Sequence, residues 1–547
     1  MAFALPDPHD TNRRWWTLGA MCFALFMIML DNTVVNVALP SIQRDLGVST
    51  SNLEWTVNAY TLTFAVLLVT GGRLGDIFGR RRWFLIGVVI FGASSLFIVF
   101  SQTASWLVIG RAAQGVGAAF MMPATLSIIT NAFPPQERGK AIGTWAGVSA
   151  MALAIGPVVG GFLVENVSWQ SIFLINVPIA VIAVGVTLWA TKESRDETAA
   201  RKVDVAGVLA LSAGLGALIL GLVEGNSWGW GSPQIIALFV VAVAGLSGFF
   251  VIEHHVRAPM LDFAYFRSRS FLGANIVAFI VSFAMLAMFF FIALYMQNVR
   301  GYSPLEAGVR FLPSTVVIIF MGPIAGRLAD KVGPRPLMSL GLVIVSASLF
   351  IQSFLAPDTS YAYLAVGFVL MGTGMGLVMS PMSTAAMNAV DHTKAGAASG
   401  VLSMSRMVGG TFGVAVMGAL ITTLGRSHLQ DSLPAASGSQ INHLVDALAG
   451  GGAGIPGAAG AAVQSAFLDA VNTALKIGSG FALVGAVVAW LLIDAIPAGD
   501  RTNEELPLGE RLELDLVEAG DAGGAPQGEA AIQGSLTEHV PAEPIRG

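Results

Sequence analysis

Charged residues and cysteine are scarce in this chain. Asp, Glu, Lys and Arg make up only 12% of its 547 residues, whereas hydrophobic residues make up 54%. A chain of this composition cannot hide its apolar side chains inside a soluble domain. The single cysteine, Cys22, excludes an intramolecular disulfide framework. Together these shortages indicate an integral membrane protein that folds without disulfide bonds.

Motifs typical of enzymes are also missing from the sequence. None of the seven histidines lies in the core of an expected helix. No metal-ligand spacing occurs, and no phosphate-cradling loop carries a lysine. We therefore expect no catalytic residue, no metal, no cofactor and no nucleic-acid partner, which predicts a protein that is not an enzyme.

Long apolar runs, in contrast, recur along the chain. A helix needs about 20 apolar residues to cross the hydrocarbon core of a bilayer. Fourteen such runs predict an all-α integral membrane fold with fourteen transmembrane helices. The expected helices cover residues 16–39, 55–72, 84–101, 106–130, 140–164, 171–190, 204–223, 234–252, 271–296, 306–326, 337–355, 361–387, 399–425 and 477–496.

Basic residues fall mainly on one side of these expected helices. If the N-terminus is cytoplasmic, 22 of the 29 Lys and Arg residues lie inside and only four lie outside. The remaining three, Arg111, Arg310 and Arg406, lie within helices. Lys and Arg are preferentially retained in cytoplasmic loops. We therefore expect a multi-pass protein of a bacterial cytoplasmic (inner) membrane, with both termini in the cytoplasm.

One polar phrase occurs twice, at residues 72–82 and 326–335, with an offset of 254 residues and no gap. A duplicated loop indicates a duplicated membrane domain. Its glycines permit close helix approach, its aspartate can face a helix N-terminus, and its arginines can bind headgroups or acids. We interpret the phrase as a cytoplasmic gate, the alternative being a solvated loop without a special role. The gate residues are Gly72, Asp76, Gly79, Arg80, Arg81 and Arg82 in the first copy and Gly326, Asp330, Gly333 and Arg335 in the second.

The offset between the two copies also predicts the domain plan. A six-helix unit occupies roughly 190 residues here, so the surplus of about 60 residues fits two further helices. The expected parts are a cytoplasmic N-terminus (1–15), an N-terminal six-helix bundle (16–190), two inserted helices with linkers (191–253), a C-terminal six-helix bundle (254–496) and a disordered acidic tail (497–547). Within the second bundle, 426–476 is expected to be a long external loop. Residues 463–475 form either an amphipathic helix or part of a flexible spacer.

Asp31 is the only one of the 34 acidic residues that lies deep in an expected helix. An ionisable group in hydrocarbon is costly and marks a functional site by default. Because burial penalises the charged carboxylate, Asp31 suits a proton carrier. Arg111 lies at a depth within about one helical turn of it, so the two can pair if their helices adjoin. The alternative is that Asp31 is a permanent ion-pair partner that joins helices.

Two further groups of residues are candidates for function. The expected helix 140–164 combines a proline with several glycines, which predicts a kink and a close contact with a neighbouring helix. Polar residues within helices, together with some Met and Phe side chains, are candidates to line a substrate cavity. The helix residues are Gly147, Gly156, Pro157, Gly160 and Gly161, and the cavity candidates are Asn36, Asn58, Tyr60, Gln114, Asn176, Met285, Phe289, Met379 and Arg406.

Five stretches resemble, in order, the signatures of the major facilitator superfamily, specifically its fourteen-helix drug:proton antiporter branch. The resemblance covers about residues 15–495. Gly72–Arg82 with Gly326–Arg335 is similar to the loop signature and its C-terminal echo. The other four stretches are 30–40, similar to the first-helix signature of the branch, 111–117, similar to that of helix 4, 147–161, similar to the antiporter signature of helix 5, and 169–178, typical of the branch.

The resemblance implies two pseudo-symmetric bundles around a central cavity, with alternating access and proton influx driving the efflux of hydrophobic or amphiphilic small molecules. It also implies that Asp31 and Arg111 take part in coupling, and that Asp76 latches the cytoplasmic side. Some members that export dicationic drugs carry acids in helices 2, 10 and 13, where this chain has Asn58, an apolar stretch near Ile318 and residues 402–407. That departure favours neutral, monocationic or amphiphilic substrates, while Arg406 offers a group for an anion.

Three functions remain open on the sequence. The leading expectation is a multidrug efflux transporter that confers antibiotic resistance and uses the proton motive force. The second is a dedicated exporter of one endogenous metabolite, such as an antibiotic or a lipid-like product. The third is a membrane sensor or scaffold that transports nothing. The expected partners are protons, small-molecule substrates and the lipid bilayer, and the sequence indicates no accessory protein.

Overall fold

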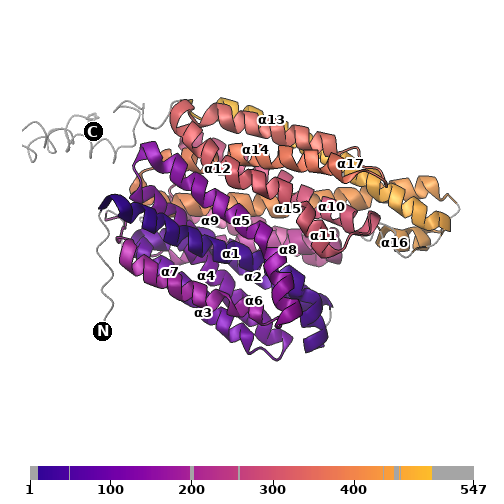
Figure 1. Cartoon of the computed structure of the whole chain (residues 1–547), viewed down its shortest axis with the longest axis horizontal. Coiled ribbons are helices and arrows are strands. Elements are labelled where there is room, and N and C mark those ends of the chain that lie inside the picture. Colours follow the sequence, from indigo (N-terminus) through magenta and orange to yellow (C-terminus); the bar gives the residue numbers. More distant parts are fainter. Residues whose placement is uncertain are drawn as a thin grey trace, which may run out of the picture. The chain divides into compact units, whose positions relative to one another are not determined.

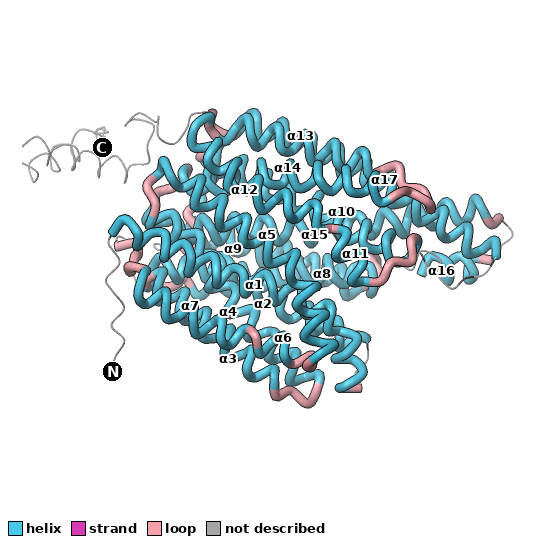
Figure 2. The backbone as a smooth tube through the Cα atoms, in the orientation of Figure 1, coloured by secondary structure: helices cyan, strands magenta, loops and turns pink. Residues whose placement is uncertain are grey.

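The computed structural model describes residues 10–47, 50–197, 202–256, 259–434, 437–446, 448, 455 and 457–495. Across these residues the chain forms helices and no strand (Figures 1 and 2). The acidic tail expected at 497–547 and the first nine residues lie outside the described residues.

Long helices account for almost the whole described chain. The first half contains α1 (Asp10–Leu46), α2 (Thr50–Phe78), α3 (Arg80–Val99), α4 (Ala104–Ala132), α5 (Pro135–Asn166), α6 (Ser171–Leu174) and α7 (Asn176–Ala190). The inserted pair is α8 (Val205–Trp228) and α9 (Pro233–His255). The second half contains η1 (Phe263–Arg267), α10 (Arg269–Leu294), η2 (Tyr295–Val299), α11 (Pro304–Arg310), α12 (Leu312–Val332), α13 (Pro334–Gln352), α14 (Tyr361–Asn388), η3 (His392–Lys394), α15 (Ala395–Ser432), α16 (Gly438–Asp446) and α17 (Gly457–Leu492).

The number of membrane spans agrees with the expected fourteen helices. In the described part of the chain, 13 helical segments are long and apolar enough to cross a membrane. Helix α5 is not among them, but its 32 residues correspond to about 48 Å of helix, more than a bilayer core requires. With α5 included, each expected span corresponds to a helix or to a pair of consecutive helices.

The two halves meet along two equivalent seams. Helix α2 packs on α15, and α12 packs on α5, which is the same contact with the halves exchanged. Helix α8 packs on α9 and also contacts α2 and α15, so the inserted pair lies against the first seam. Figure 1 shows the elements of the first half (indigo to magenta) gathered together and most of the second half (orange to yellow) beside them.

The repeat end is the end at which residues 72–82 and 326–335 lie, where α2 and α12 finish and α5 and α15 begin. The far end is the other one, where α4 begins.

The structure differs from the expected long loop at 426–476. Helix α15 continues to Ser432, α16 follows, and α17 starts at Gly457, so most of this segment is helical. The amphipathic helix expected from 463 to 475 is the first half of α17, continuous with the last span. Val463, Phe467 and Val471, spaced one turn apart, are fully buried. This apolar face packs on the protein, which removes the need for a separate surface helix.

Two expected spans are broken in the structure. The run 306–326 divides into α11 and α12 at Phe311, and the run 171–190 divides into α6 and α7 at Ile175. Pro313 lies in the first turn of α12. Proline is tolerated there but cannot continue a preceding helix, which accounts for the first break.

Close helix packing within the first half depends on glycine. A Cβ atom at Gly117 of α4 would lie 2.8 Å from the carbonyl oxygen of Gly87 and 2.8 Å from the amide nitrogen of Phe91, both in α3. We predict that Gly117→Val separates α3 from α4 and destabilises the fold by about 1–3 kcal/mol, a typical cost of overpacking. Reversible unfolding of the purified protein in mixed micelles would measure this loss.

A control for this prediction is Gly185→Val in α7, where a Cβ would meet nothing within 4 Å. The control is expected to unfold like the parent protein. Equal stability of the two variants would contradict the packing argument.

Candidate functional site

A buried ion pair joins α1 to α4. The Nη1 atom of Arg111 donates to Oδ2 of Asp31 at 2.5 Å, and both side chains are at most 1% exposed. The other carboxylate oxygen, Oδ1, accepts from Nδ2 of Asn176 in α7 at 2.9 Å and from Nε2 of Gln114 in α4 at 3.3 Å. The Asp31 carboxylate is thus enclosed by donors from two other helices, as a charge without access to water requires.

The same network extends to α3 and α2. The hydroxyl oxygen of Ser95 in α3 accepts from Gln114 at 2.7 Å and from Asn176 at 3.3 Å. On the α2 side, Nε of Arg111 donates to the carbonyl of Thr56 at 3.1 Å, and the guanidinium lies 4.3 Å from the ring centroid of Tyr60. Besides Asp31, Arg111 contacts the carbonyl of Thr56, Oε1 of Gln114 at 2.8 Å and the rings of Tyr60 and Phe173, and none of these contacts requires a charged carboxylate.

The network changes the interpretation of three cavity candidates. Gln114, Asn176 and Tyr60 are all at most 1% exposed, and each faces the Asp31–Arg111 pair. The structure therefore places them around the ion pair and not on the wall of an open cavity. Sequence analysis could not distinguish these positions because both require a polar residue within a helix.

The first copy of the repeated phrase binds the second half of the chain. Oδ1 of Asp76 accepts from Nε and Nη2 of Arg80 at 2.8 and 2.6 Å and from the amide of Gly396 at 2.9 Å. Oδ2 accepts from the amide of Ala397 at 2.7 Å. Gly396 and Ala397 belong to the first turn of α15, whose amides have no partner within the helix. Asp76 therefore caps α15 from a different helix, with the favourable charge for a helix N-terminus.

The second copy makes the equivalent contact with exchanged halves. Oδ1 and Oδ2 of Asp330 accept from the amides of Gly139 and Lys140 in α5 at 3.1 and 3.2 Å. Backbones approach closely at both positions, because a Cβ on Gly72 would collide with the carbonyl of Gly396, and one on Gly326 with the carbonyl of Gly139. The repeated phrase thus fastens each half to the other at the repeat end.

The two fastenings are not equally strong. Asp76 is fully buried and ion-paired with Arg80, whereas Asp330 is partly buried and has Pro334 at the position that corresponds to Arg80. Asp330 also contacts amides in the second turn of α5, beyond the unpaired first turn. Asp76, in contrast, binds amides that have no partner within their helix, and Arg80 also donates to the carbonyl of Thr393 in the second half. On these two grounds the α2–α15 fastening is the stronger of the two.

The remaining gate residues support the turns at the repeat end. Gly79 and Gly333 have φ angles of 112° and 81°, a conformation that favours glycine. Glu193 accepts from the amides of Arg81 and Arg82 at the start of α3, at 3.0 and 3.1 Å. In the second copy, Arg335 donates to the carbonyl of Ile493 at 2.8 Å, which ties α13 to the end of α17.

Helix α5 packs on both halves of the protein. A Cβ on Gly156 would collide with Thr33 of α1, and one on Gly160 would lie 3.1 Å from Cα of Val34. On its other face, a Cβ on Gly147 would lie 3.1 Å from the carbonyl oxygen of Ile319 in α12. A Cβ on Gly161 would meet no atom within 4 Å. The side chain of Pro157 lies outside the described part of the structure.

The other cavity candidates do not form one cluster. Met285, Phe289 and Met379 are partly buried and pack against the main hydrophobic core. Asn58 of α2 donates to Oε1 of Glu224 in α8 at 3.4 Å. Arg406 lies in α15, and its surroundings are described below. The side chain of Asn36 lies outside the described part of the structure.

Sequence analysis missed three buried acids. Besides Asp31 and Asp76, the side chains of Asp196, Glu224 and Glu253 are at most 5% exposed. Glu224 escaped notice because the expected span ended at residue 223, whereas α8 continues to Trp228. The tryptophans at 228 and 230 are the signal that could have extended it, since an aromatic belt at the interface implies helix up to that level.

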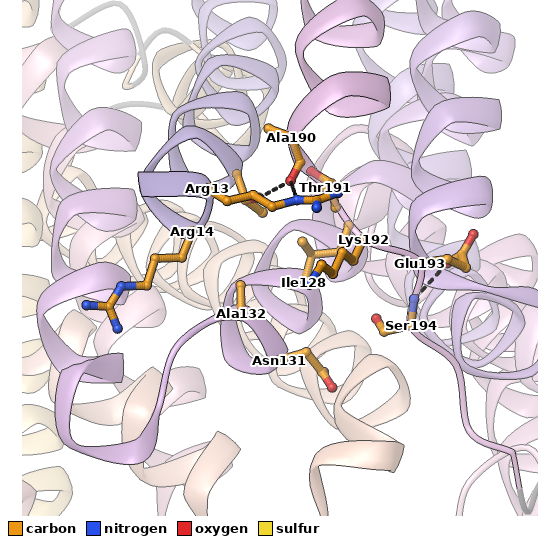
Figure 3. Close-up of a pocket in the computed structure, with 11 residues that line it drawn as sticks. Arg13, Arg14, Ile128, Asn131, Ala132, Ala190, Thr191, Lys192, Glu193 and Ser194 are labelled. Carbon is orange, nitrogen blue, oxygen red and sulfur yellow. Dashed lines mark hydrogen bonds between the residues drawn. The ribbon is translucent and has the colours of Figure 1, made fainter. Parts of the chain in front are cut away.

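Two pockets lie away from the ion pair. One of about 320 Å³ lies at the repeat end and is lined by Arg13, Arg14 and Lys192 among others (Figure 3). In Figure 3 the side chain of Arg14 points away from the other labelled residues, and it pairs with Glu137 at 3.1 Å. The second pocket, of about 340 Å³, is apolar and lies where α8 and α9 meet α10 and α15. Neither contains a residue that the sequence had marked as functional.

The unequal fastenings can be tested by amide exchange. We predict that Asp76→Asn speeds hydrogen–deuterium exchange at the start of α15 by about tenfold or more, because a hydrogen bond to a charged group contributes about 1.5–3 kcal/mol. Asp330→Asn is expected to have a smaller effect on residues 139 and 140, because Asp330 lacks the arginine partner. Exchange measured by mass spectrometry on the full chain would compare the two, and a larger effect of Asp330→Asn would contradict the ranking.

Comparisons with known proteins agree with this architecture. The family model described as Major Facilitator Superfamily matches residues 21–414. The proton:xylose symporter XylE, a solved structure of that superfamily, superposes with a TM-score of 0.59 at 14% identity and covers 91% of this chain and 99% of its own. At that identity the likeness concerns the fold alone.

Two curated relatives are closer in sequence. The tetracenomycin C resistance and export protein of Streptomyces glaucescens is 34% identical over 510 residues, which cover 91% of this chain and 95% of that protein. The multidrug resistance protein Stp of Mycobacterium tuberculosis is 36% identical over 424 residues, which cover 76% of this chain and 78% of that protein. The helical fold, the paired seams and these matches lead to one conclusion: the chain belongs to the major facilitator superfamily.

Proposed function

We propose that this protein exports hydrophobic or amphiphilic compounds across a bacterial cytoplasmic membrane in exchange for protons. The observation that carries the proposal is the Asp31–Arg111 pair, a carboxylate and a cation buried together within the helices. An intramembrane ion pair is costly and is typical of transport and proton relay. The names of the two relatives, one a resistance and export protein and the other a multidrug resistance protein, support export as the direction.

Proton binding at Asp31 would change the forces between α1 and α4. A protonated Asp31 no longer attracts Arg111, while the guanidinium keeps its contacts with Thr56, Gln114 and Tyr60. Protonation of Asp31 would therefore weaken the Asp31–Arg111 contact, while Arg111 would still have hydrogen-bond and aromatic partners. Release of the proton restores the ion pair. The protonated and the deprotonated protein would thus favour different arrangements of α1 and α4, and proton binding would shift the population between them.

The position of α5 offers a path from this pair to the gate. Thr33 and Val34, which follow Asp31 closely in α1, contact Gly156 and Gly160 of α5. The opposite end of α5 forms the seam with α12 and receives Asp330. A shift of α1 on protonation would thus move the helix that closes the second seam.

The fastenings at the repeat end would act as the cytoplasmic gate. We assign the repeat end to the cytoplasm because its loops carry most of the basic residues. With both seams in contact there, the structure would represent the conformer that is closed at the cytoplasmic side. Transport would require Asp76 to leave the start of α15 and Asp330 to leave α5 once in each cycle.

The alternative function is a dedicated exporter of one endogenous metabolite. The relative that is named for tetracenomycin C alone favours this reading, whereas the multidrug relative favours a broad one. Growth of an expressing strain on a panel of unrelated toxins separates them. Protection against several chemical classes is expected for a multidrug exporter, and protection against one compound would support the dedicated exporter.

Asp31→Asn tests the coupling. Asn cannot carry a proton at physiological pH, so efflux driven by a pH gradient in inverted vesicles is expected to fall at least a hundredfold while the protein remains inserted and folded. Asp358→Asn, at an exposed site between α13 and α14, is the matched control and should keep parental efflux. Unchanged efflux by Asp31→Asn would remove the residue from the mechanism and favour a sensor or scaffold.

Asp76→Asn tests the gate. Because Asp76 stabilises only the conformer that is closed at the repeat end, its loss is expected to lower the turnover rate several-fold and to leave substrate binding within about twofold. Efflux kinetics and equilibrium binding of one fluorescent substrate give the two quantities. Weaker binding with an unchanged turnover rate would contradict a gating role.

A further inference from the structure

Arg406 lies within the membrane-spanning helix α15, opposite a tryptophan of the other half. It is eleven residues beyond the start of α15 at Ala395, and Trp145 is ten residues beyond the start of α5 at Pro135. Both helices start at the repeat end, so both residues lie about 15–17 Å along their helices from that end and at a similar level. The guanidinium lies 5.7 Å from the ring centroid of Trp145.

Arg406 has no acidic partner among the described residues. Its Nη2 donates to Oγ of Ser403 at 3.4 Å, and its buried Nε has no hydrogen-bond acceptor in the described structure. The side chain as a whole is half-buried, so part of it stays accessible. Of the three buried arginines in the described chain, Arg80 and Arg111 each pair with a carboxylate, and Arg138 donates to two backbone carbonyls and to Oδ1 of Asn388. Arg406 is less buried than these three, and its one hydrogen bond in the described structure is the long contact with Ser403.

An uncompensated guanidinium at this depth is unfavourable. A charge at the bilayer centre costs several kcal/mol unless it is paired or hydrated. Cation–π attraction from Trp145, with the guanidinium 5.7 Å from the ring centroid, offsets only part of this cost. A bound negative charge would compensate the remainder, and the free Nε offers the second donor of the fork that arginine uses to hold carboxylates.

Trp145 adds a fixed aromatic surface to this cation. Its Nε1 donates to Oγ1 of Thr125 in α4 at 3.1 Å, and its side chain is 2% exposed. The ring orientation is therefore set by the first half of the chain, whereas Arg406 is carried by the second half. An anion held by Arg406 would therefore lie at the boundary between the two halves.

From these contacts we infer that Arg406, with Trp145 beside it, forms a subsite for an anionic oxygen on a hydrophobic aromatic substrate. Carboxylates, phenolates and enolates on a planar apolar body are the chemical class that fits. The inference rests on the proposed export function and specifies its substrates. It also predicts a preference for anionic over cationic substrates, because Arg406 is positive in a region where some exporters of dicationic drugs carry an acid.

The test compares the binding of three dyes to the purified full-length protein. Carboxyfluorescein is anionic, rhodamine 6G is cationic and Nile red is neutral, and fluorescence anisotropy in detergent gives each dissociation constant. Arg406→Gln is expected to weaken carboxyfluorescein binding at least tenfold and to leave Nile red within twofold. Arg406→Lys, which keeps the charge but not the fork, should recover part of the loss. Rhodamine 6G should bind equally well or more tightly to Arg406→Gln.

Arg310→Gln is the matched control. Arg310 lies near the far end, where its guanidinium stacks 3.7 Å from the ring centroid of Tyr302. It should not alter the ranking of the three dyes.

Two outcomes would overturn the inference. Equal losses for all three dyes would mean that Arg406 supports the structure and does not select charge. Unchanged carboxyfluorescein binding, with a melting temperature that rises with chloride only when Arg406 is present, would mean that the site holds an inorganic anion. The proposed export function is judged separately, by proton-driven efflux of Nile red and its loss in Asp31→Asn, which do not depend on Arg406.

Discussion

The structure depends on the close approach of two pairs of helices at the repeat end. Gly72 lies against Gly396, and Gly326 against Gly139, so the two halves meet there through backbone atoms. Only at such distances can Asp76 and Asp330 reach amides of a helix in the other half. Contacts of this kind exist in a closed or an open state with little between, because the hydrogen bonds require short distances. The repeated phrase is therefore suited to a two-state element.

Three sites in this protein balance their charge differently. Asp31 and Arg111 pair with one another among polar partners, and Asp76 with Arg80 is held by the first turn of α15. Arg406 has no carboxylate partner among the described residues and faces an aromatic ring across the boundary between the halves. Two of these sites have an internal partner. At the third site, Arg406, a bound anion would supply the missing negative charge.

The inserted helices α8 and α9 support one of the two seams between the halves. Helix α8 contacts both members of the α2–α15 seam, and its Glu224 accepts from Asn58 in α2. It thus adds a polar contact to the seam on the side away from α5. In the α5–α12 seam the corresponding support is absent among the described contacts, and the fastening by Asp330 is also the weaker one. The two seams are therefore related in topology but unequal in strength.

The sequence alone determined the membrane character, the fourteen spans, the duplicated polar phrase and the positions of Asp31 and Arg111 within helices, because hydropathy, charge position and repetition are local or periodic properties. It did not show that Gln114, Asn176 and Tyr60 surround the ion pair, it ended one span before Glu224, and it left open whether residues 463–475 are helical, since burial depends on which helices adjoin. Only the tertiary structure decided that Asp76 caps α15 and that Arg406 faces Trp145 without a carboxylate. These contacts join residues more than 250 positions apart, and no spacing within one helix contains them.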